Sequence, residues 1–298
     1  MSSRTGSGSD AGGASVIHDL GYRSYDGPRR STFAIARTLY VTGLLHAFGL
    51  KRSGRSKVLP FALLGFNLVP AAVLVGVVAL TKIEPPVHYP DYASLTQVLS
   101  SIFAAAQAPV LFSRDLRHGS IVLYLARPLR SALLAVTRWL SLTSAIAIFL
   151  LAPVLLLWIG SLLARHDAAE HSAAAGKAAL AALLLAAVLA SVTGLISAWS
   201  TRRGFAVVAS IAVLVLGGGV VSIVQFLAID VGSSLVGQAA GLLSPYSLYA
   251  GIAHALDSAA QAVTPPTGLG VLGYVAVAFA VPAACLALLV QRFRRAAR

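Results

Sequence analysis

Charged side chains are scarce in this sequence, and cysteine is almost absent. Only 11% of its 298 residues are Asp, Glu, Lys or Arg, whereas about a quarter of a soluble domain is charged. Because Cys285 is the single cysteine, an intrachain disulfide is excluded. Asp, Glu, Lys, Arg and His are all missing from six long apolar runs. This composition is typical of a membrane protein and not of a soluble domain.

The absence of these residues from the apolar runs also limits the function. Carriers driven by protons or ions usually bind them at ionisable side chains inside the membrane. Unwound backbone can also bind ions, so this class stays open. If the protein moves a solute uphill, we expect the energy to come from a partner.

Six apolar runs are long enough to cross a membrane as helices, because a hydrocarbon core about 30 Å thick needs about 20 residues. They predict an all-α, polytopic membrane protein with a six-helix transmembrane domain over residues 57–291. The runs are Leu59–Leu80, Ala93–Phe112, Trp139–Leu163, Ala178–Trp199, Phe205–Ile229 and Gly270–Val290.

Twenty of the 23 basic residues fall in four clusters that alternate with weakly charged loops. The clusters lie before residue 58, in Ser113–Arg138, in Thr201–Gly204 and in the basic tail 292–298. Lys and Arg concentrate in cytoplasmic loops, so both termini are predicted to lie in the cytoplasm. The net charge of +13 is then explained by contact with anionic lipid and not by nucleic acid.

The N-terminal region divides into two predicted parts. Residues 1–30 are expected to form a cytoplasmic tail, whose Ser- and Gly-rich beginning has no core-forming pattern. Residues 31–56 are expected to form an amphipathic helix with a basic linker. A span over Ser31–Leu50 would break the alternation of charge, so we favour a helix in the inner membrane interface. Phe33, Tyr40, Leu44 and Phe48 would form its apolar face.

The loop Asp230–Thr267 contains no Lys or Arg but many small residues. Ser244 followed by Pro245 is a typical helix start, with the serine as N-cap. Two short helices are therefore expected, near Val231–Leu243 and Pro245–Ala259. They would dip back into the outer leaflet, which requires that protein or water satisfies their backbone.

Polar residues and glycines within the spans have two interpretations each. Asn67 and three glutamines can bond neighbouring helices or line a substrate path. Three successive glycines in the fifth span can permit close helix packing or form a flexible point in a gating helix. The candidate residues for a path or gate are Gln97, Gln107, Gly217, Gly218, Gly219 and Gln225.

Other short patterns predict no site. Gly49–Ser56 has glycines spaced as in a phosphate-binding loop, but it precedes a membrane span and follows no strand. His166, Glu170 and His171 are spaced one residue too widely for an inverted zinc-protease motif, and a solvated helix face is the simpler interpretation. No catalytic set, metal site or cofactor site is predicted in this chain.

The segment between the second and third spans carries a family signal. Ser113–Pro128, with the sequence SRDLRHGSIVLYLARP, resembles the cytoplasmic segment of ABC-2-type transporter permeases. In that family an acidic residue, a glycine and then an Arg-Pro pair occupy this segment. The family usually has glutamate where Asp115 stands, which is a mild departure. The Tyr25–Arg29 turn also resembles the N-terminal segment of bacterial members.

This resemblance implies a permease subunit in the bacterial plasma membrane that exports a substrate as part of a dimer. The second permease subunit could be identical or different. Two separate ATPase subunits would bind ATP and magnesium, so the chain would not be an enzyme by itself. The resemblance also implies a coupling helix near Asp115–Tyr124, with spans two and five lining the path. The residues implied to couple to the ATPase are Asp115, Leu116, Arg117, Gly119, Tyr124, Arg127 and Pro128.

Three other classes remain as alternatives: a stand-alone channel or secondary carrier, a membrane-embedded enzyme acting on lipid, and a sensor or scaffold that transports nothing. The absence of clustered catalytic residues argues against the enzyme. Transport without an ATPase would favour the channel or carrier, and ATPase binding without turnover would favour the sensor.

Overall fold

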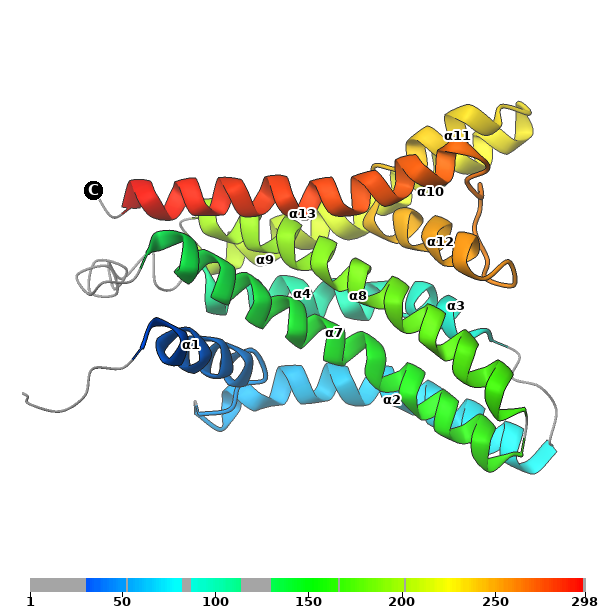
Figure 1. Cartoon of the computed structure of the whole chain (residues 1–298), viewed down its shortest axis with the longest axis horizontal. Coiled ribbons are helices and arrows are strands. Elements are labelled where there is room, and N and C mark those ends of the chain that lie inside the picture. Colours follow the sequence, from blue (N-terminus) through cyan, green and yellow to red (C-terminus); the bar gives the residue numbers. More distant parts are fainter. Residues whose placement is uncertain are drawn as a thin grey trace, which may run out of the picture. The chain divides into compact units, whose positions relative to one another are not determined.

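Helices account for all the regular structure in the described part of the chain (Figure 1). The computed structural model describes residues 31–51, 53–81, 87–113, 130–165, 167–200 and 202–296. The residues from Thr32 onward form one compact unit.

Five helices in the described ranges are long and apolar enough to cross a membrane, and a sharply bent pair of helices passes the same test when its members are taken together. The prediction of a multi-pass, all-helical membrane protein is therefore confirmed. Four of the long helices are α2 (Arg55–Thr81), α7 (Ser131–Leu163), α8 (Ala168–Trp199) and α13 (Leu269–Ala296). The fifth is a continuous helix made of α9 (Arg203–Ile211), the π-helical turn η1 (Ala212–Leu216) and α10 (Gly217–Asp230).

The second predicted span, Ala93–Phe112, is not one straight helix. It is replaced by α3 (Tyr89–Leu95) and α4 (Gln97–Leu111), whose axes differ by 65°. Thr96 closes the end of α3, because its backbone N–H and its hydroxyl both donate to the carbonyl of Tyr92. The carbonyl of Thr96 then accepts from Ser100 N as α4 begins. The sequence is apolar on both sides of Thr96, so it does not predict this bend.

The antiparallel helices α7 and α8 form the centre of the bundle, and α1, α2, α4 and α13 pack around them (Figure 1). Phe149 and Leu150 of α7 are fully or almost fully buried, as is Leu189 of α8. Both helices are longer than the predicted spans. The carboxylate of Asp167 caps α8 by accepting from the N–H groups of Ala169 and Glu170, so α8 begins ten residues before the expected Ala178.

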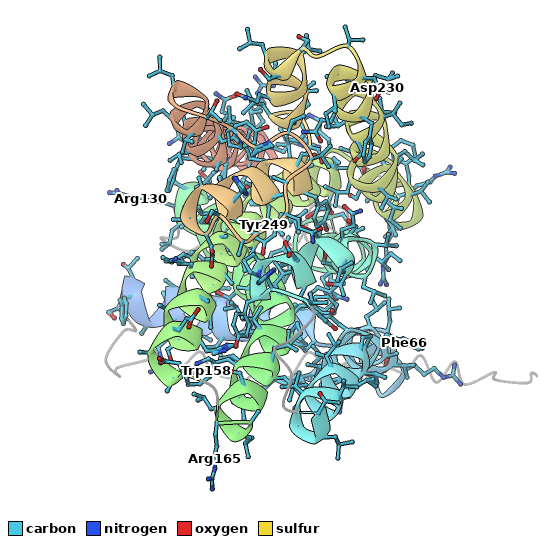
Figure 2. The ribbon with its side chains drawn as sticks, turned by 90° about the vertical axis from the view of Figure 1, so that its right-hand side faces the viewer. Phe66, Arg130, Trp158, Arg165, Asp230 and Tyr249 are labelled. Atoms are coloured by element: carbon cyan, nitrogen blue, oxygen red, sulfur yellow. The ribbon has the colours of Figure 1, made fainter. Side chains whose placement is uncertain are left out.

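The outward faces of the long helices are apolar. Phe66 of α2 and Phe226 of α10 are 67% and 59% exposed, and Figure 2 shows Phe66 pointing away from the bundle. Exposed apolar surface on this scale would be unfavourable in water but is suited to lipid.

Helix α1 (Thr32–Ala47) confirms the predicted N-terminal helix, and it packs against α7. The Tyr40 hydroxyl donates to Ser144 Oγ over 2.8 Å, and Ser141 Oγ donates to the Tyr40 carbonyl over 3.0 Å. A Cβ on Gly43 would lie 2.6 Å from Ser141 Oγ, so the two helices meet closely here. Phe33, which was expected on the apolar face, is 79% exposed.

Two short helices, α11 (Ser234–Gly241) and α12 (Pro245–Leu256), follow α10 and are called the loop helices below. Both were expected, but each is shorter than the predicted range. Ser244 caps α12 by accepting from Ser247 N, as the sequence indicated. Neither helix is long enough to cross a membrane.

Many of the charged residues that the structure describes lie near one end of the bundle or the other. At one end, called the basic end, α7 and α9 begin and α13 finishes. It carries Arg130, Arg138, Arg202, Arg203, Arg292, Arg294 and Arg295. The opposite end, called the acidic end, carries Asp91, Asp167, Glu170, Asp230 and Asp257 together with Arg165 and Lys177. Figure 2 is viewed from the acidic end and shows Arg165 extending away from the helices.

Replacing Gly160 of α7 by alanine is expected to weaken the contact between α2 and α7. A Cβ at this position would lie 2.5 Å and 2.7 Å from the two Cγ atoms of Val75, and a β-branched side chain has little freedom to move aside. Overpacking of this kind costs about 1–3 kcal/mol. The thermal unfolding midpoint of the purified protein in nanodiscs should therefore fall.

Gly76→Ala in α2 is the matched control, because a Cβ there would meet no atom within 4 Å. Its unfolding midpoint should equal or exceed that of the unchanged protein, since alanine favours the helix. Equal midpoints for the two variants would contradict the close approach of α2 and α7.

Candidate functional site

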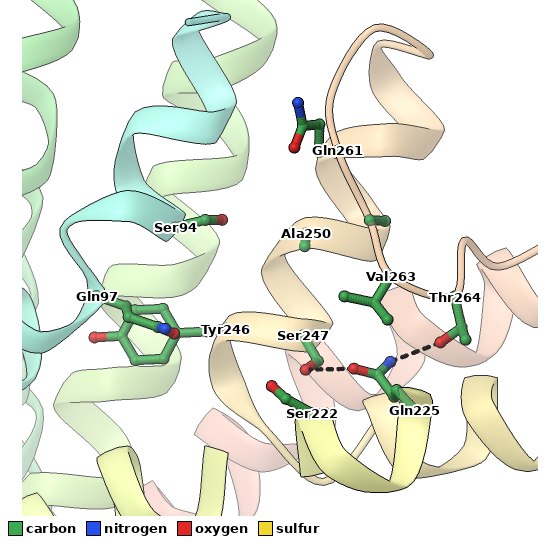
Figure 3. Close-up of a pocket in the computed structure, with 11 residues that line it drawn as sticks. Ser94, Gln97, Ser222, Gln225, Tyr246, Ser247, Ala250, Gln261, Val263 and Thr264 are labelled. Carbon is green, nitrogen blue, oxygen red and sulfur yellow. Dashed lines mark hydrogen bonds between the residues drawn. The ribbon is translucent and has the colours of Figure 1, made fainter. Parts of the chain in front are cut away.

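A polar cavity lies where the broken helix pair α3–α4 meets α10, α12 and the loop after α12 (Figure 3). Its volume is about 320 Å³. Its polar side chains are all amides and hydroxyls, so we call it the amide pocket. The lining residues are Ser94, Gln97, Ser222, Gln225, Tyr246, Ser247, Ala250, Gln261, Ala262, Val263 and Thr264.

Gln225 of α10 is the structural centre of this pocket and is only 3% exposed. Its Nε2 donates to Thr264 Oγ1 over 2.6 Å and to the carbonyl of Gly237 over 3.3 Å. Its Oε1 accepts from Ser247 Oγ over 3.1 Å, and Figure 3 shows the two side-chain bonds. One amide therefore connects α10 to both loop helices and to the loop after α12.

Two tyrosines attach α12 to the broken helix pair. The Tyr246 hydroxyl lies 2.8 Å from both Ser100 Oγ and Ser101 Oγ of α4. The Tyr249 hydroxyl donates to the carbonyl of Pro90 in α3 over 2.7 Å, and Figure 2 shows Tyr249 lying among the helices. Burial raises the pKa of Tyr246 to about 12, and the serine hydrogen bonds lower it only in part. The hydroxyl of Tyr246 therefore keeps its proton at neutral pH.

Helix geometry explains why these residues meet. The cap at Ser244 and Pro245 fixes where α12 begins, and residues three apart lie on the same side of a helix. Tyr246 and Tyr249 consequently both reach the broken pair. The break at Thr96 places Ser94 before the bend and Gln97 after it, and both line the pocket.

The predicted path or gate residues fall in three places. Gln97 and Gln225 come from different predicted spans and line the same pocket. Gln107 is 4% exposed, deeper in α4, and is not among the lining residues. The glycines at 217–219 also lie outside the lining. That these residues line or gate a path stays a prediction.

The glycine triplet follows directly after the π-helical turn η1. A Cβ on Gly217 or Gly219 would meet no atom within 4 Å, and one on Gly218 would only touch Ser244 Oγ at 3.5 Å. Close packing within this chain therefore does not explain Gly217 and Gly219. A π turn beside three weak helix formers is instead a place where this long helix is easily deformed.

Asn67 bonds neighbouring helices to one another, which was one of the two roles expected for it. Its Nδ2 donates to the carbonyl of Phe149 in α7 over 2.9 Å, and its backbone carbonyl accepts from the hydroxyl of Tyr92 in α3. This residue joins three helices and is fully buried.

Sequence reasoning missed the contributions of Tyr246, Ser247 and Thr264 to the pocket. The only available signal was the Ser244-Pro245 cap, which located α12 but not its neighbours. The coupling residues Asp115, Leu116, Arg117, Gly119, Tyr124, Arg127 and Pro128 lie outside the described residues, as does His166. The nearest described residues on either side are Ser113, which follows the end of α4, and Arg130, which precedes α7.

The described lining is suited to binding and not to acid–base chemistry, because amides and neutral hydroxyls do not exchange protons readily at neutral pH. Among the residues that the structure describes, no group of three or more His, Cys, Asp or Glu side chains could hold a metal ion. The pocket can offer hydrogen bonds to a neutral ligand.

Neither the protein-family models nor the curated proteins compared with this chain match it. The resemblance to ABC-2-type permeases therefore rests on the residues of the 113–128 segment and of the N-terminal turn.

Gln225→Met is expected to release the loop helices from α10. The variant keeps a side chain of similar length but loses three hydrogen bonds, and it leaves Thr264 and Ser247 without this partner. Leaving buried polar groups unpaired costs about 1–3 kcal/mol. Amide hydrogen exchange measured by mass spectrometry should become faster in α11 and α12, while α7 stays protected.

Gln291→Met in α13 is the control, since this exposed glutamine lies at the basic end. Its exchange in α11 and α12 should match that of the unchanged protein. Slow exchange of the loop helices in Gln225→Met would contradict the anchoring role of the amide.

Proposed function

We propose that this chain is the transmembrane permease subunit of an ATP-driven exporter, with ATP hydrolysed by a separate subunit. The observation that carries the proposal is the path of α4. Its first residue, Gln97, lines the amide pocket, and just past its last turn Ser113 leads into the segment that resembles a coupling helix. One helix thus joins the pocket to the segment where an ATPase would dock.

Helix α4 is suited to transmit movement. Eleven of its 15 residues are buried, and it packs against α1, α2, α7, α8 and α9. A close-packed helix shifts as a rigid body and does not bend gradually. A push on the 114–129 segment would therefore reach the bend at Thr96 and the pocket beside it.

The distribution of charge supports one orientation in the membrane. The basic end would face the cytoplasm, because Lys and Arg are retained there. Both termini would then be cytoplasmic, α1 would lie at the inner interface, and the loop helices would lie in the outer leaflet as a gate. In a bacterial cell this membrane is the plasma membrane.

The proposal includes a second permease subunit, identical to this chain or different. The lipid-suited faces of α2, α10 and α13 provide surface for such a contact, with Phe66, Phe226 and Phe279 all exposed. ATP and magnesium would be bound by the two ATPase subunits and not by this chain.

Charge reversal in the proposed coupling segment tests this function. Asp115→Lys or Arg117→Glu should leave membrane insertion intact but reduce ATPase copurification by about tenfold or more, which corresponds to the loss of about 1.4 kcal/mol of binding. Stimulated ATP hydrolysis should be lost with it. The chain is purified from its own membrane with the ATPase that accompanies it, and both quantities are measured on that complex.

Asp230→Lys and Arg165→Glu are the matched controls, because they reverse the same charges at the acidic end. They should leave copurification and ATP hydrolysis unchanged. Solute transport by the chain alone in liposomes, without nucleotide, would overturn the proposal in favour of a channel or secondary carrier. Equal loss in the controls would overturn the docking site.

A further inference from the structure

The polar groups of the amide pocket divide into those that hold the fold and those that are open. The amide of Gln225 and the hydroxyls of Ser247, Thr264 and Tyr246 are all engaged in hydrogen bonds. In the described chain, the side chains of Ser94, Gln97 and Gln261 have no hydrogen-bond partner. Figure 3 shows these three side chains on the two sides of the space between α3–α4 and the loop after α12. The open groups are therefore placed to contact a ligand.

We propose that the amide pocket binds the neutral, hydroxyl-rich headgroup of an amphiphile, such as a sugar joined to an alkyl chain. This inference rests on the proposed function, because it identifies the substrate class of the same site. It uses the chemistry of the open groups, the absence of charge from the lining and the position of the pocket beside a lipid-facing helix.

The hydrogen-bonding chemistry fits a polyol. A primary amide both donates and accepts, and so does a serine hydroxyl. Each hydroxyl of a sugar also donates and accepts. A sugar hydroxyl can therefore pair with either of the open amides or with the serine hydroxyl of the pocket. Gln97 and Gln261 approach from opposite sides of the pocket and can contact one ring at two edges.

The lack of charge argues against an ionic headgroup. None of the residues that line the pocket is Asp, Glu, Lys, Arg or His. A charged group moved from water into this pocket would lose its hydration without gaining a counter-ion, and that exchange is unfavourable. Neutral hydroxyls lose less hydration and recover it as hydrogen bonds.

The position of α10 favours an amphiphile over a free sugar. Ser222 and Gln225 line the pocket, while Ile223 and Phe226, the next residues along the helix, are 61% and 59% exposed on its apolar surface. With 3.6 residues per turn, these pairs occupy adjacent faces of the helix. A headgroup can therefore occupy the pocket while its alkyl chain follows the lipid-facing surface of α10.

The size of the pocket limits what it holds. Its volume of about 320 Å³ is near the lower limit of known ligand pockets, which span about 300–1,000 Å³. It accommodates a headgroup of roughly one sugar ring, so a longer glycan would have only one of its units bound here.

Titration with single-chain probes tests the proposal. The purified chain is placed in nanodiscs of neutral lipid, and heat of binding is measured for octyl glucoside, octyl sulfate, octyltrimethylammonium and glucose. Each probe is kept below its micelle-forming concentration, and the signal from empty nanodiscs is subtracted. Octyl glucoside should saturate one site and bind about tenfold or more tightly than either charged probe. Glucose should bind more weakly than octyl glucoside.

Variants locate the binding. Gln97→Ala with Gln261→Ala should weaken octyl glucoside binding by about tenfold, because two open amides are lost. Gln291→Ala, an exposed glutamine outside the pocket, should leave it unchanged. Equal affinity for a charged probe, or unchanged affinity in the double variant, would overturn the neutral-headgroup site. Glucose binding as tightly as octyl glucoside would overturn the amphiphile and leave a soluble sugar.

The result is separable from the proposed function. ATPase copurification that depends on Asp115, together with no saturable glucoside binding, would overturn the substrate class alone. Glucoside binding with no accompanying ATPase would keep the neutral site and overturn the exporter.

Discussion

A bilayer core offers no water to hydrogen-bond a polar group, and many of the polar contacts in this structure meet that constraint. The long helices satisfy their own backbone groups. Hydroxyls within them bond back one turn, as Ser191 does to the carbonyl of Ala187 and Thr193 to that of Leu189. The buried Asn67 bonds to Phe149 of the neighbouring helix. Where a helix is interrupted at Thr96, the carbonyl of Tyr92 accepts from both the N–H and the hydroxyl of Thr96.

The amide pocket is a consequence of the same constraint. The ends of the two loop helices do not reach the water on both sides of the membrane, because these helices are too short to span it. Side chains from neighbouring helices hold them in place instead. Gln225 serves α11 and α12 together, and Tyr246 and Tyr249 join α12 to α4 and α3. Packing irregular elements against a bent helix leaves a cavity that straight helices would close. The groups that remain unpaired in that cavity are neutral, and this determines which ligand it suits.

In the proposed function the ATPase docks at the basic end and the substrate binds in the pocket. Helix α4 connects these two places. Energy would enter at a surface rich in arginine, and the substrate would bind at an uncharged site near the acidic end. Gln225 lies on the continuous helix formed by α9, η1 and α10. The deformable part of this helix, at η1 and the glycine triplet, lies between its beginning at the basic end and Gln225. The close-packed α4 and the deformable part of α10 thus both lead to the pocket, as the proposed gate would need.

Hydropathy was enough to predict the helical class and the approximate positions of the long helices, because membrane burial acts on each segment separately. The cap at Ser244 and Pro245 was readable for the same local reason. The 65° bend at Thr96, the early start of α8 and the convergence of Gln97 with Gln225 were not readable. They depend on which helices pack together, and contacts between residues far apart in the chain leave no pattern within any one segment. The sequence thus determined what each helix is made of, whereas only the tertiary structure decided which of its polar groups meet.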